Sequence, residues 1–311
     1  MKENPAAHGP GEEVLTMSGT RIYRSEEGRR LVLAAYDALL ERWPVALERL
    51  TVDTNLGETF VLASGPADAP PLVLLHGAGA NSVVWIGEIG RLARNRRVFA
   101  VDLPGEPGRT CEARPPWDGP ALGDWLLSVM DRLGLESASL LGLSQGGWTA
   151  LKAATSAPAR VCSLLLLSPG GITRDNLWFA VRAGLYQCLG DSGHARIRRM
   201  VFGRERVPAE MERFLALVMR EFKPRLEMLP LFSDEQLRQL TMPTLVLVGS
   251  EDRLRSPGPI IARVQRLVPT ATAEIVPGAS HALLNGFHRV ERHLAEWTPV
   301  GAWADPQMPS S

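Results

Sequence analysis

The sequence has little of several features that mark specialised classes of protein. Its 311 residues include only three cysteines, Cys111, Cys162 and Cys188. An odd and sparse set of cysteines supplies no disulfide framework, and their spacing relative to the histidines matches no zinc motif. Lysine plus arginine and aspartate plus glutamate both number 34, so the net charge is zero. A balanced charge argues against nucleic acid or an anionic membrane as the main partner.

Long apolar runs are also missing. The longest apolar stretches have the length of a strand and fall far short of the ~20 residues that would span a bilayer. The first twenty residues are rich in glycine, proline and charge, and they lack the apolar run of a secretory signal. We therefore expect a cytoplasmic protein without a membrane span. Nothing in the sequence predicts its oligomeric state.

Short apolar runs rich in leucine and valine alternate with helical patterns along most of the chain. Strands that are apolar throughout are typical of a parallel sheet covered on both faces. The strands are predicted at 47–52, 59–63, 72–75, 98–101, 139–141, 161–167, 244–248 and 273–276, with the first two forming an antiparallel hairpin. Helices are predicted at 83–93, 120–133, 146–156, 259–267 and 282–297. The sequence thus predicts an α/β fold with a mostly parallel eight-stranded sheet flanked by helices.

One interval breaks this alternation. Between residues 172 and 240 the patterns are helical, with many arginines and several large apolar residues. About seventy residues of helix are too long for a simple connection between two strands. We therefore predict that this interval is a helical lid over the strand ends.

A further helix is predicted before the sheet. Ser25 is suited to cap it, and Leu31, Ala35, Leu39 and Trp43 fall on one face. The predicted division of the chain is a disordered arm over 1–20, an accessory helix over 21–46, an α/β core over 47–171 and 241–298, the lid over 172–240, and a tail over 299–311.

The strongest motif is Gly142-Leu143-Ser144-Gln145-Gly146, which follows a predicted strand and opens a predicted helix. This is the context of a nucleophile elbow, in which a serine occupies a sharp and strained strand-to-helix turn. Small residues on either side allow the helix and the strand to approach closely. The N-terminus of the helix then places positive potential beneath the serine. The motif predicts that Ser144 is a nucleophile.

A second motif, His76-Gly77-Ala78-Gly79, follows the strand predicted at 72–75. In proteins with a nucleophile elbow, the loop after this strand supplies one amide of the oxyanion hole, and the residue after the nucleophile supplies the other. By position, these are the N–H groups of Ala78 and Gln145. Fixed backbone amides stabilise the negative charge that develops on the carbonyl oxygen. His76 itself is expected to have a structural role at the strand end.

The order of these motifs resembles the α/β-hydrolase superfamily, and specifically its lidded carboxylesterase and cofactor-free haloperoxidase-like branch. The resemblance covers the chain from Arg49 to Trp297 and implies the α/β-hydrolase fold with an inserted helical lid. One departure concerns the turn after Asp102, which is one residue longer than in the family and is expected to reshape the pocket. The segments that carry the resemblance are 76–79, 101–105, 142–147, 249–252 and 278–281.

The resemblance also implies an acid on the turn after the strand at 244–248, where Asp252 stands. A carboxylate at this place holds the imidazole of a catalytic histidine in the correct tautomer and stabilises its protonated form. Glu251 is the immediate rival, because it lies on the same turn. Asp175, beyond the preceding strand, is a more distant one.

The general base is predicted to be His281, in the segment Gly278-Ala279-Ser280-His281 just after the last strand. The chain order Ser144, Asp252, His281 is the order that α/β-hydrolases use. Among the rivals, His288 and His293 lie further along the final predicted helix. The last two candidates are His8 in the arm and His194 in the lid.

Together these residues predict a serine hydrolase that cleaves an ester, or a related acyl bond, of a hydrophobic small molecule through an acyl-enzyme. Neither a metal nor an organic cofactor is expected. Two alternatives stay open. The same triad serves C–C bond, thioester or lactone cleavage, perhydrolysis and biosynthetic cyclisation, because a fold does not determine its chemistry. A non-catalytic ligand receptor on this scaffold is the other.

Overall fold

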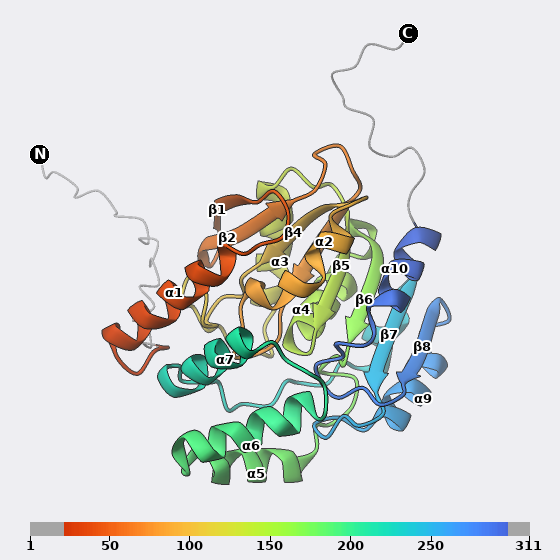
Figure 1. Ribbon diagram of the computed structural model, residues 1–311. Helices are drawn as coiled ribbons and strands as arrows, with labels where there is room; N and C mark the ends of the chain where they lie inside the picture. The colour runs from red at the N-terminus through yellow and green to blue at the C-terminus, as the bar shows by residue number, and fades with distance from the viewer. Residues whose placement is uncertain (1–21, 298–311) are drawn as a thin grey trace, which may run out of the picture.

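In the computed structural model, which describes residues 22–297, an eight-stranded sheet runs through the centre of the protein (Figure 1). The strand order is β1-β2-β4-β3-β5-β6-β7-β8. The hairpin β1–β2 is antiparallel and β2 also runs antiparallel to β4, whereas the remaining neighbours are parallel. The mostly parallel sheet predicted from the sequence is confirmed. The bounds are β1 (Glu48–Thr54), β2 (Gly57–Ser64), β3 (Pro71–Leu75), β4 (Arg97–Val101), β5 (Ala138–Leu143), β6 (Val161–Leu167), β7 (Thr244–Gly249) and β8 (Ala271–Val276).

Each face of the sheet is covered by its own apolar layer. Neighbouring strand residues point to opposite faces, so Val73 and Leu75 of β3 join one layer while Leu72 and Leu74 join the other. This is why the central strands are apolar throughout. The first layer contains residues of α3 (Ala121–Arg132), α4 (Gln145–Ser156) and α9 (Pro257–Leu267). The second contains residues of α1 (Glu26–Leu40), η1 (Ser82–Gly87), α2 (Ile89–Leu92) and α10 (Phe287–Glu296).

Two predicted helices have different bounds in the structure. The helix expected at 83–93 is divided into the 3₁₀ helix η1 and the short α2. The final helix begins at Phe287 instead of Ala282. Leu283 adopts a φ of 53°, and an L-residue in this left-handed region interrupts a right-handed helix. A second short 3₁₀ helix, η2 (Pro158–Arg160), precedes β6.

The accessory helix α1 begins where the sequence predicts, because the Ser25 hydroxyl accepts a hydrogen bond from the Gly28 N–H at 2.9 Å. The buried face matches the predicted one only in part, since Leu39 and Trp43 are buried as predicted. Val32 and Tyr36 are fully buried, whereas Leu31 is 39% exposed. Tyr36 can be buried because its hydroxyl donates a hydrogen bond to Asp102 at 3.0 Å.

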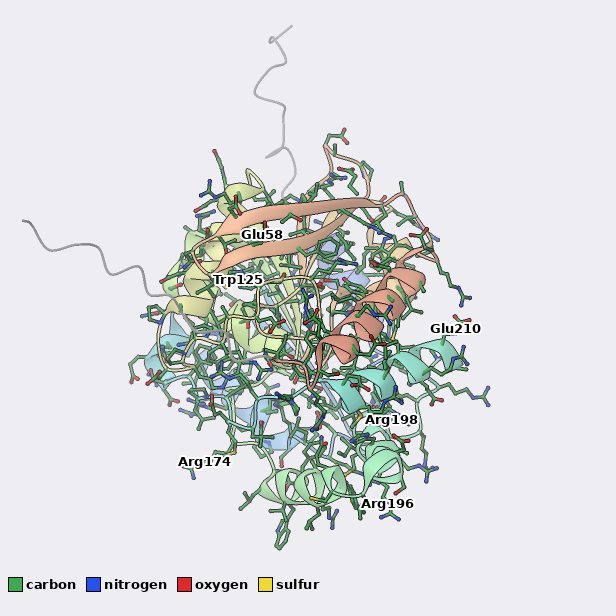
Figure 2. The ribbon with its side chains drawn as sticks, turned by 90° about the vertical axis from the view of Figure 1, so that its left-hand side faces the viewer. Glu58, Trp125, Arg174, Arg196, Arg198 and Glu210 are labelled. Atoms are coloured by element: carbon green, nitrogen blue, oxygen red, sulfur yellow. The ribbon has the colours of Figure 1, made fainter. Side chains whose placement is uncertain are left out.

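The helices of the interval 172–240, which was predicted to be one lid, pack against different parts of the molecule. It contains α5 (Leu177–Gln187), α6 (Gly190–Phe202), α7 (Ala209–Glu221) and α8 (Asp234–Arg238). Helices α5 and α6 lie together at one end of the molecule, whereas α7 lies beside α1 (Figures 1 and 2). Asp234 at the start of α8 forms ion pairs with Arg263 and Arg266 of α9.

Within residues 22–297, no helix combines the length and the apolar character needed to cross a membrane. The same part of the chain contains no cluster of three or more histidine, cysteine, aspartate or glutamate side chains suited to hold a metal ion. The predicted arm over 1–20 and the predicted tail over 299–311, together with His8, lie outside the described residues.

Candidate active site

Ser144 stands at the turn from β5 into α4 with φ 55° and ψ −109°, a strained conformation for a residue with a side chain. The close crossing of strand and helix explains the glycines around it. A Cβ on Gly142 would lie 2.5 Å from the backbone of Gly146, and a Cβ on Gly146 would lie 2.1 Å from the carbonyl oxygen of Leu75. Only glycine fits at these two positions, so the elbow geometry is built into the sequence.

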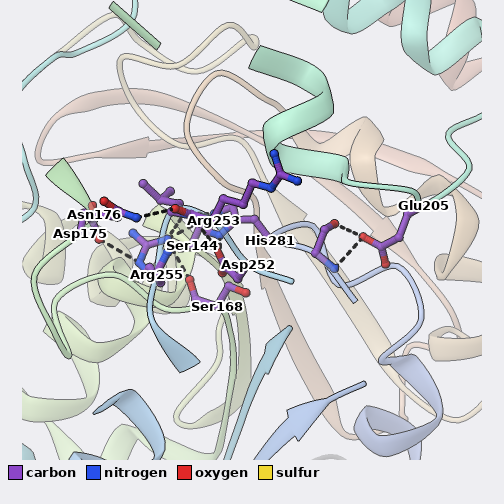
Figure 3. Close-up of polar contacts among 11 residues, drawn as sticks. Ser144, Ser168, Asp175, Asn176, Glu205, Asp252, Arg253, Arg255 and His281 are labelled. Atoms are coloured by element: carbon purple, nitrogen blue, oxygen red, sulfur yellow. Dashed lines mark hydrogen bonds and ion pairs between the residues drawn. The ribbon is translucent and has the colours of Figure 1, made fainter. Parts of the chain in front are cut away.

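The structure brings Ser144, His281 and Asp252 into one hydrogen-bonded chain (Figure 3). The Oγ of Ser144 lies 3.0 Å from Nε2 of His281, and Nδ1 of His281 lies 2.8 Å from Oδ2 of Asp252. The other carboxylate oxygen of Asp252 accepts the N–H groups of Leu254 and Arg255 at 2.9 and 3.0 Å. All three functional side chains lie at the carboxyl ends of strands.

The environment keeps Asp252 ionised. Burial alone would raise the pKa of Asp252, but the His281 ring, the hydrogen bonds to the carboxylate and the nearby Arg255 lower it more. The net result is a pKa below the usual value. An ionised carboxylate is the form that accepts the Nδ1–H of His281, so Nε2 is left facing the serine.

The rival residues have other surroundings. Glu251 is exposed and faces a hollow beside Arg199 and Arg204. Asp175 forms an ion pair with Arg255. Among the histidines, His288 contacts Arg289 and His293 lies 2.9 Å from Ser163, while His194 is buried in α6.

The two residues expected to supply the oxyanion amides come from different elements. Ala78 lies in the loop after β3, and Gln145 is the first residue of α4. Within the described part of the chain, neither backbone N–H donates to a protein acceptor. His76 has the structural role expected of it, because its Nε2 accepts the Leu103 N–H at 2.8 Å.

The turn after Asp102 places a buried carboxyl group between these two segments. Oε2 of Glu106 accepts the Gly79 N–H at 2.7 Å, and Oε1 accepts a hydrogen bond from the Gln145 side chain at 3.0 Å. Burial raises the pKa of Glu106 to about 7, although these two hydrogen bonds and the more distant Arg114 and Arg225 act in the opposite direction. The sequence showed that this turn is unusual but not that Glu106 points inward.

Arg255 was not anticipated. Its side chain is 2% exposed, and its Nη1 lies 3.1 Å from Ser144 Oγ, 3.1 Å from the Ser168 carbonyl oxygen and 3.3 Å from His281 Nε2 (Figure 3). Its Nε lies 3.1 Å from a carboxylate oxygen of Asp175. Burial lowers the pKa of Arg255, and Asp175 and Asp252 oppose this effect. The sequence offers one weak signal, which is the position of this arginine three residues after Asp252 on the same turn.

Comparisons with known proteins agree with the fold. A sequence profile described as the alpha/beta hydrolase family matches residues 72–292. An uncharacterized carboxylesterase, nap, of Bacillus subtilis (strain 168) is 30% identical over 286 residues, which cover 89% of this chain and 91% of that protein. The chain therefore belongs to the alpha/beta hydrolase family, in its carboxylesterase-type branch.

Two solved structures from Bacillus subtilis are similar over most of their length. The crystal structure of carboxylesterase CesB (YbfK) is 29% identical, with a TM-score of 0.78, and the match covers 87% of this chain and 98% of that one. The crystal structure of naproxen esterase (carboxylesterase NP) is 30% identical, with a TM-score of 0.73 and coverage of 83% and 95%.

Proposed function

We propose that this protein hydrolyses a carboxylic ester of a hydrophobic small molecule through a covalent acyl-enzyme on Ser144. The observation that carries the proposal is the hydrogen-bonded chain from Asp252 through His281 to a serine at a strained strand-to-helix turn. The carboxylesterase relatives support the same class of reaction.

In the first half of the reaction, Ser144 Oγ attacks the ester carbonyl carbon and its proton passes to Nε2 of His281. Asp252 stabilises the protonated imidazole through the Nδ1 hydrogen bond, which measures 2.8 Å in the free protein. The negative charge on the former carbonyl oxygen is stabilised by the N–H groups of Ala78 and Gln145. His281 then protonates the leaving alcohol, and the C–O bond breaks.

In the second half, His281 removes a proton from water, which attacks the acyl carbon and releases the carboxylic acid. The reaction needs no redox step, and the proton taken from water returns to Ser144. Ser144, His281 and Asp252 thus each act in both acylation and deacylation.

The segment 172–240 is proposed to act as a lid on this site. Its first residues are tied to the turn that carries Asp252, because Asn176 donates from its backbone N–H to the Leu254 carbonyl at 2.8 Å and from its side chain to the Arg253 carbonyl at 3.3 Å. On α5, Leu177, Trp178 and Leu185 are 64–70% exposed. Exposed apolar side chains next to a site favour a hydrophobic substrate.

The test is the hydrolysis of p-nitrophenyl esters of increasing acyl length by the wild type and by Ser144→Ala. Removing the nucleophile of such a triad costs about 10⁶ in kcat, so we expect the variant to fall to the background rate. Ser168→Ala is the matched control, since this serine also ends a strand beside the site but presents only its backbone carbonyl to Arg255.

An inert wild type, or equal activity in Ser144→Ala, would show that simple ester hydrolysis at Ser144 is wrong. The assay would then be repeated with thioesters, lactones and C–C bond substrates, and with a search for tight ligand binding without turnover. The thioesters, lactones and C–C bond substrates test the other reactions of the same triad. The search for ligand binding tests whether the protein is a non-catalytic receptor.

A further inference from the structure

Arg255 has no part in the ester mechanism described above, although it touches the nucleophile. Transfer of a guanidinium group from water to a site that is 98% buried is costly unless the charge has partners. Asp175 faces its Nε edge, while Asp252 is already occupied by His281 and by two backbone N–H groups. Asp175 therefore balances the charge of Arg255 but does not explain why its Nη1 contacts the reacting serine.

The two terminal nitrogens of Arg255 differ in their partners. Nη1 donates to Ser144 Oγ and to the Ser168 carbonyl oxygen. Nη2 makes no hydrogen bond within residues 22–297, and it is not among the fully buried atoms that lack a partner. It lies over the backbone of Gly170, where an added Cβ would come within 3.1 Å of it. Nη2 thus has free donor capacity beside the serine, whereas both hydrogens of Nη1 are already donated.

Nη1 also contacts two atoms that the reaction needs. His281 Nε2 must accept the Ser144 proton, yet Nη1 lies 3.3 Å from this nitrogen and donates to Ser144 Oγ at 3.1 Å. A positive charge at this place opposes the build-up of positive charge on the imidazole. A group that attracts Nη1 away from Ser144 and His281 would favour the reaction.

A carboxylate is the group that does this best, because it accepts two parallel hydrogen bonds from the edge of a guanidinium. We propose that Arg255 is a substrate-binding residue for a carboxylate carried on the acyl part of the ester, and that binding it draws Nη1 away from Ser144 and His281. This inference rests on the proposed ester hydrolysis. The hydrophobic part of the substrate then lies in the alcohol.

The position of Nη1 limits the distance between the two functional groups of the substrate. Nη1 is in hydrogen-bonding contact with Ser144 Oγ, the atom to which the acyl carbon becomes bonded. With carbon–carbon bonds of about 1.5 Å, roughly one to three methylene groups separate the ester carbonyl from the carboxylate. The substrate class is therefore the half-esters of short dicarboxylic acids with hydrophobic alcohols.

The test compares esters that differ only in charge. Monobenzyl succinate and monobenzyl glutarate are matched with the neutral benzyl esters of succinamic and glutaramic acid, and the release of benzyl alcohol is followed by chromatography. The wild type is expected to have a kcat/KM at least 10-fold higher for the half-esters, since a charge-assisted hydrogen bond is worth about a factor of ten or more. In Arg255→Met this ratio is expected to fall to about one.

Arg253→Met is the matched control, because Arg253 lies on the same turn but is exposed and lines the arginine-rich hollow on the surface. It should keep the ratio of the wild type, which excludes general attraction of anions by surface arginines. Arg255→Lys retains the charge without the two-pronged edge and should keep only part of the preference.

Three results separate the possibilities. If the wild type cleaves neither kind of ester, the proposed function has failed. If it cleaves both kinds equally, or if Arg255→Met slows both by the same factor, ester hydrolysis stands and the carboxylate site is wrong. If the Arg255 variants do not fold, inhibition of the wild type decides the question, because glutarate should compete with the neutral ester at least 10-fold better than glutaramide. Equal inhibition by the two would overturn the proposal.

Discussion

Glu106 is the residue that connects the two loops carrying the proposed oxyanion amides. One carboxyl oxygen is bonded to the Gly79 N–H and the other to the side chain of Gln145. Ala78 is thus held in place through its neighbour Gly79, and Gln145 through its own side chain. The backbone N–H groups of these two residues are the proposed oxyanion donors. The turn after Asp102 supplies this connection.

The raised pKa of Glu106 predicts a pH dependence of stability. In the unfolded chain this carboxyl group ionises near 4.5, whereas in the folded protein burial raises its pKa to about 7. The folded state therefore holds the proton more tightly, and its stability decreases as the pH rises from about 5 through 7. The decrease amounts to about 3 kcal/mol at most, since one pKa unit corresponds to about 1.4 kcal/mol.

Glu106→Gln cannot ionise, so its thermal midpoint should fall less than that of the wild type between pH 5.5 and 8.5. Thermal unfolding followed by circular dichroism measures this difference. Glu136→Gln, at an exposed position, should behave like the wild type. Parallel pH profiles for Glu106→Gln and the wild type would show that Glu106 does not titrate in this range.

For single residues, the sequence predicts the position of those that come shortly after the end of a strand. Ser144 and His281 each follow a predicted strand directly, and the structure brings them within hydrogen-bonding distance. The sequence does not say which way a side chain on a turn points. Glu251 and Asp252 are adjacent, yet only Asp252 contacts His281. Likewise Arg253 is exposed and Arg255 is buried, although both lie on one turn.

At the scale of elements, the crossing of β5, α4 and β3 positions the serine. Helix α4 begins directly after Ser144, and its residue Gly146 lies against the end of β3. The close approach orients the first N–H groups of the helix toward the space next to the serine. A change in the separation of α4 and β3 would therefore displace the nucleophile and the Gln145 amide together.

Gly146→Ala tests this dependence, because its Cβ would lie 2.1 Å from the Leu75 carbonyl oxygen, a backbone atom. We expect a loss of about 3 kcal/mol or more in the free energy of unfolding, measured with urea, and a large loss of esterase activity. Gly258→Ala is the matched control, since this glycine lies in the first turn of α9 with no atom within 4 Å of an added Cβ. An unchanged urea midpoint for Gly146→Ala would contradict the close packing at the elbow.

The pattern of apolar residues predicted most of the helices and strands. It did not predict which of them pack against each other. Alternating apolar strands and helices predicted the sheet and its flanking layers. The segment 172–240 was correctly expected to be helical, but α7 lies beside α1 and α8 is joined to α9 by ion pairs. Such contacts join residues far apart in the chain, and a local pattern contains no information about them. The burial of Tyr36 on α1 was not predicted for the same reason, because its hydroxyl bonds to Asp102, 66 residues away.

For the whole molecule, the arrangement of the sheet explains why the site lies where it does. Ser144 follows β5 and Asp252 follows β7, with β6 between these two strands, and His281 follows β8 at the edge of the sheet. Parallel strands deliver the residues after their carboxyl ends to one side of the molecule. The inserted helices leave the sheet from the same side, after β6. Nucleophile, acid, base and insertion are thus brought together by topology.

If Ser144 is a nucleophile activated by His281, it should react with a serine-directed fluorophosphonate. The protein would be incubated with the reagent, and the mass of the intact chain and of its peptides would then be measured. We expect one phosphonyl group per chain on Ser144 and no labelling of Ser144→Ala. Ser168→Ala should be labelled like the wild type, and His281→Ala far more slowly. An unlabelled wild type, or a label on another residue, would contradict this account.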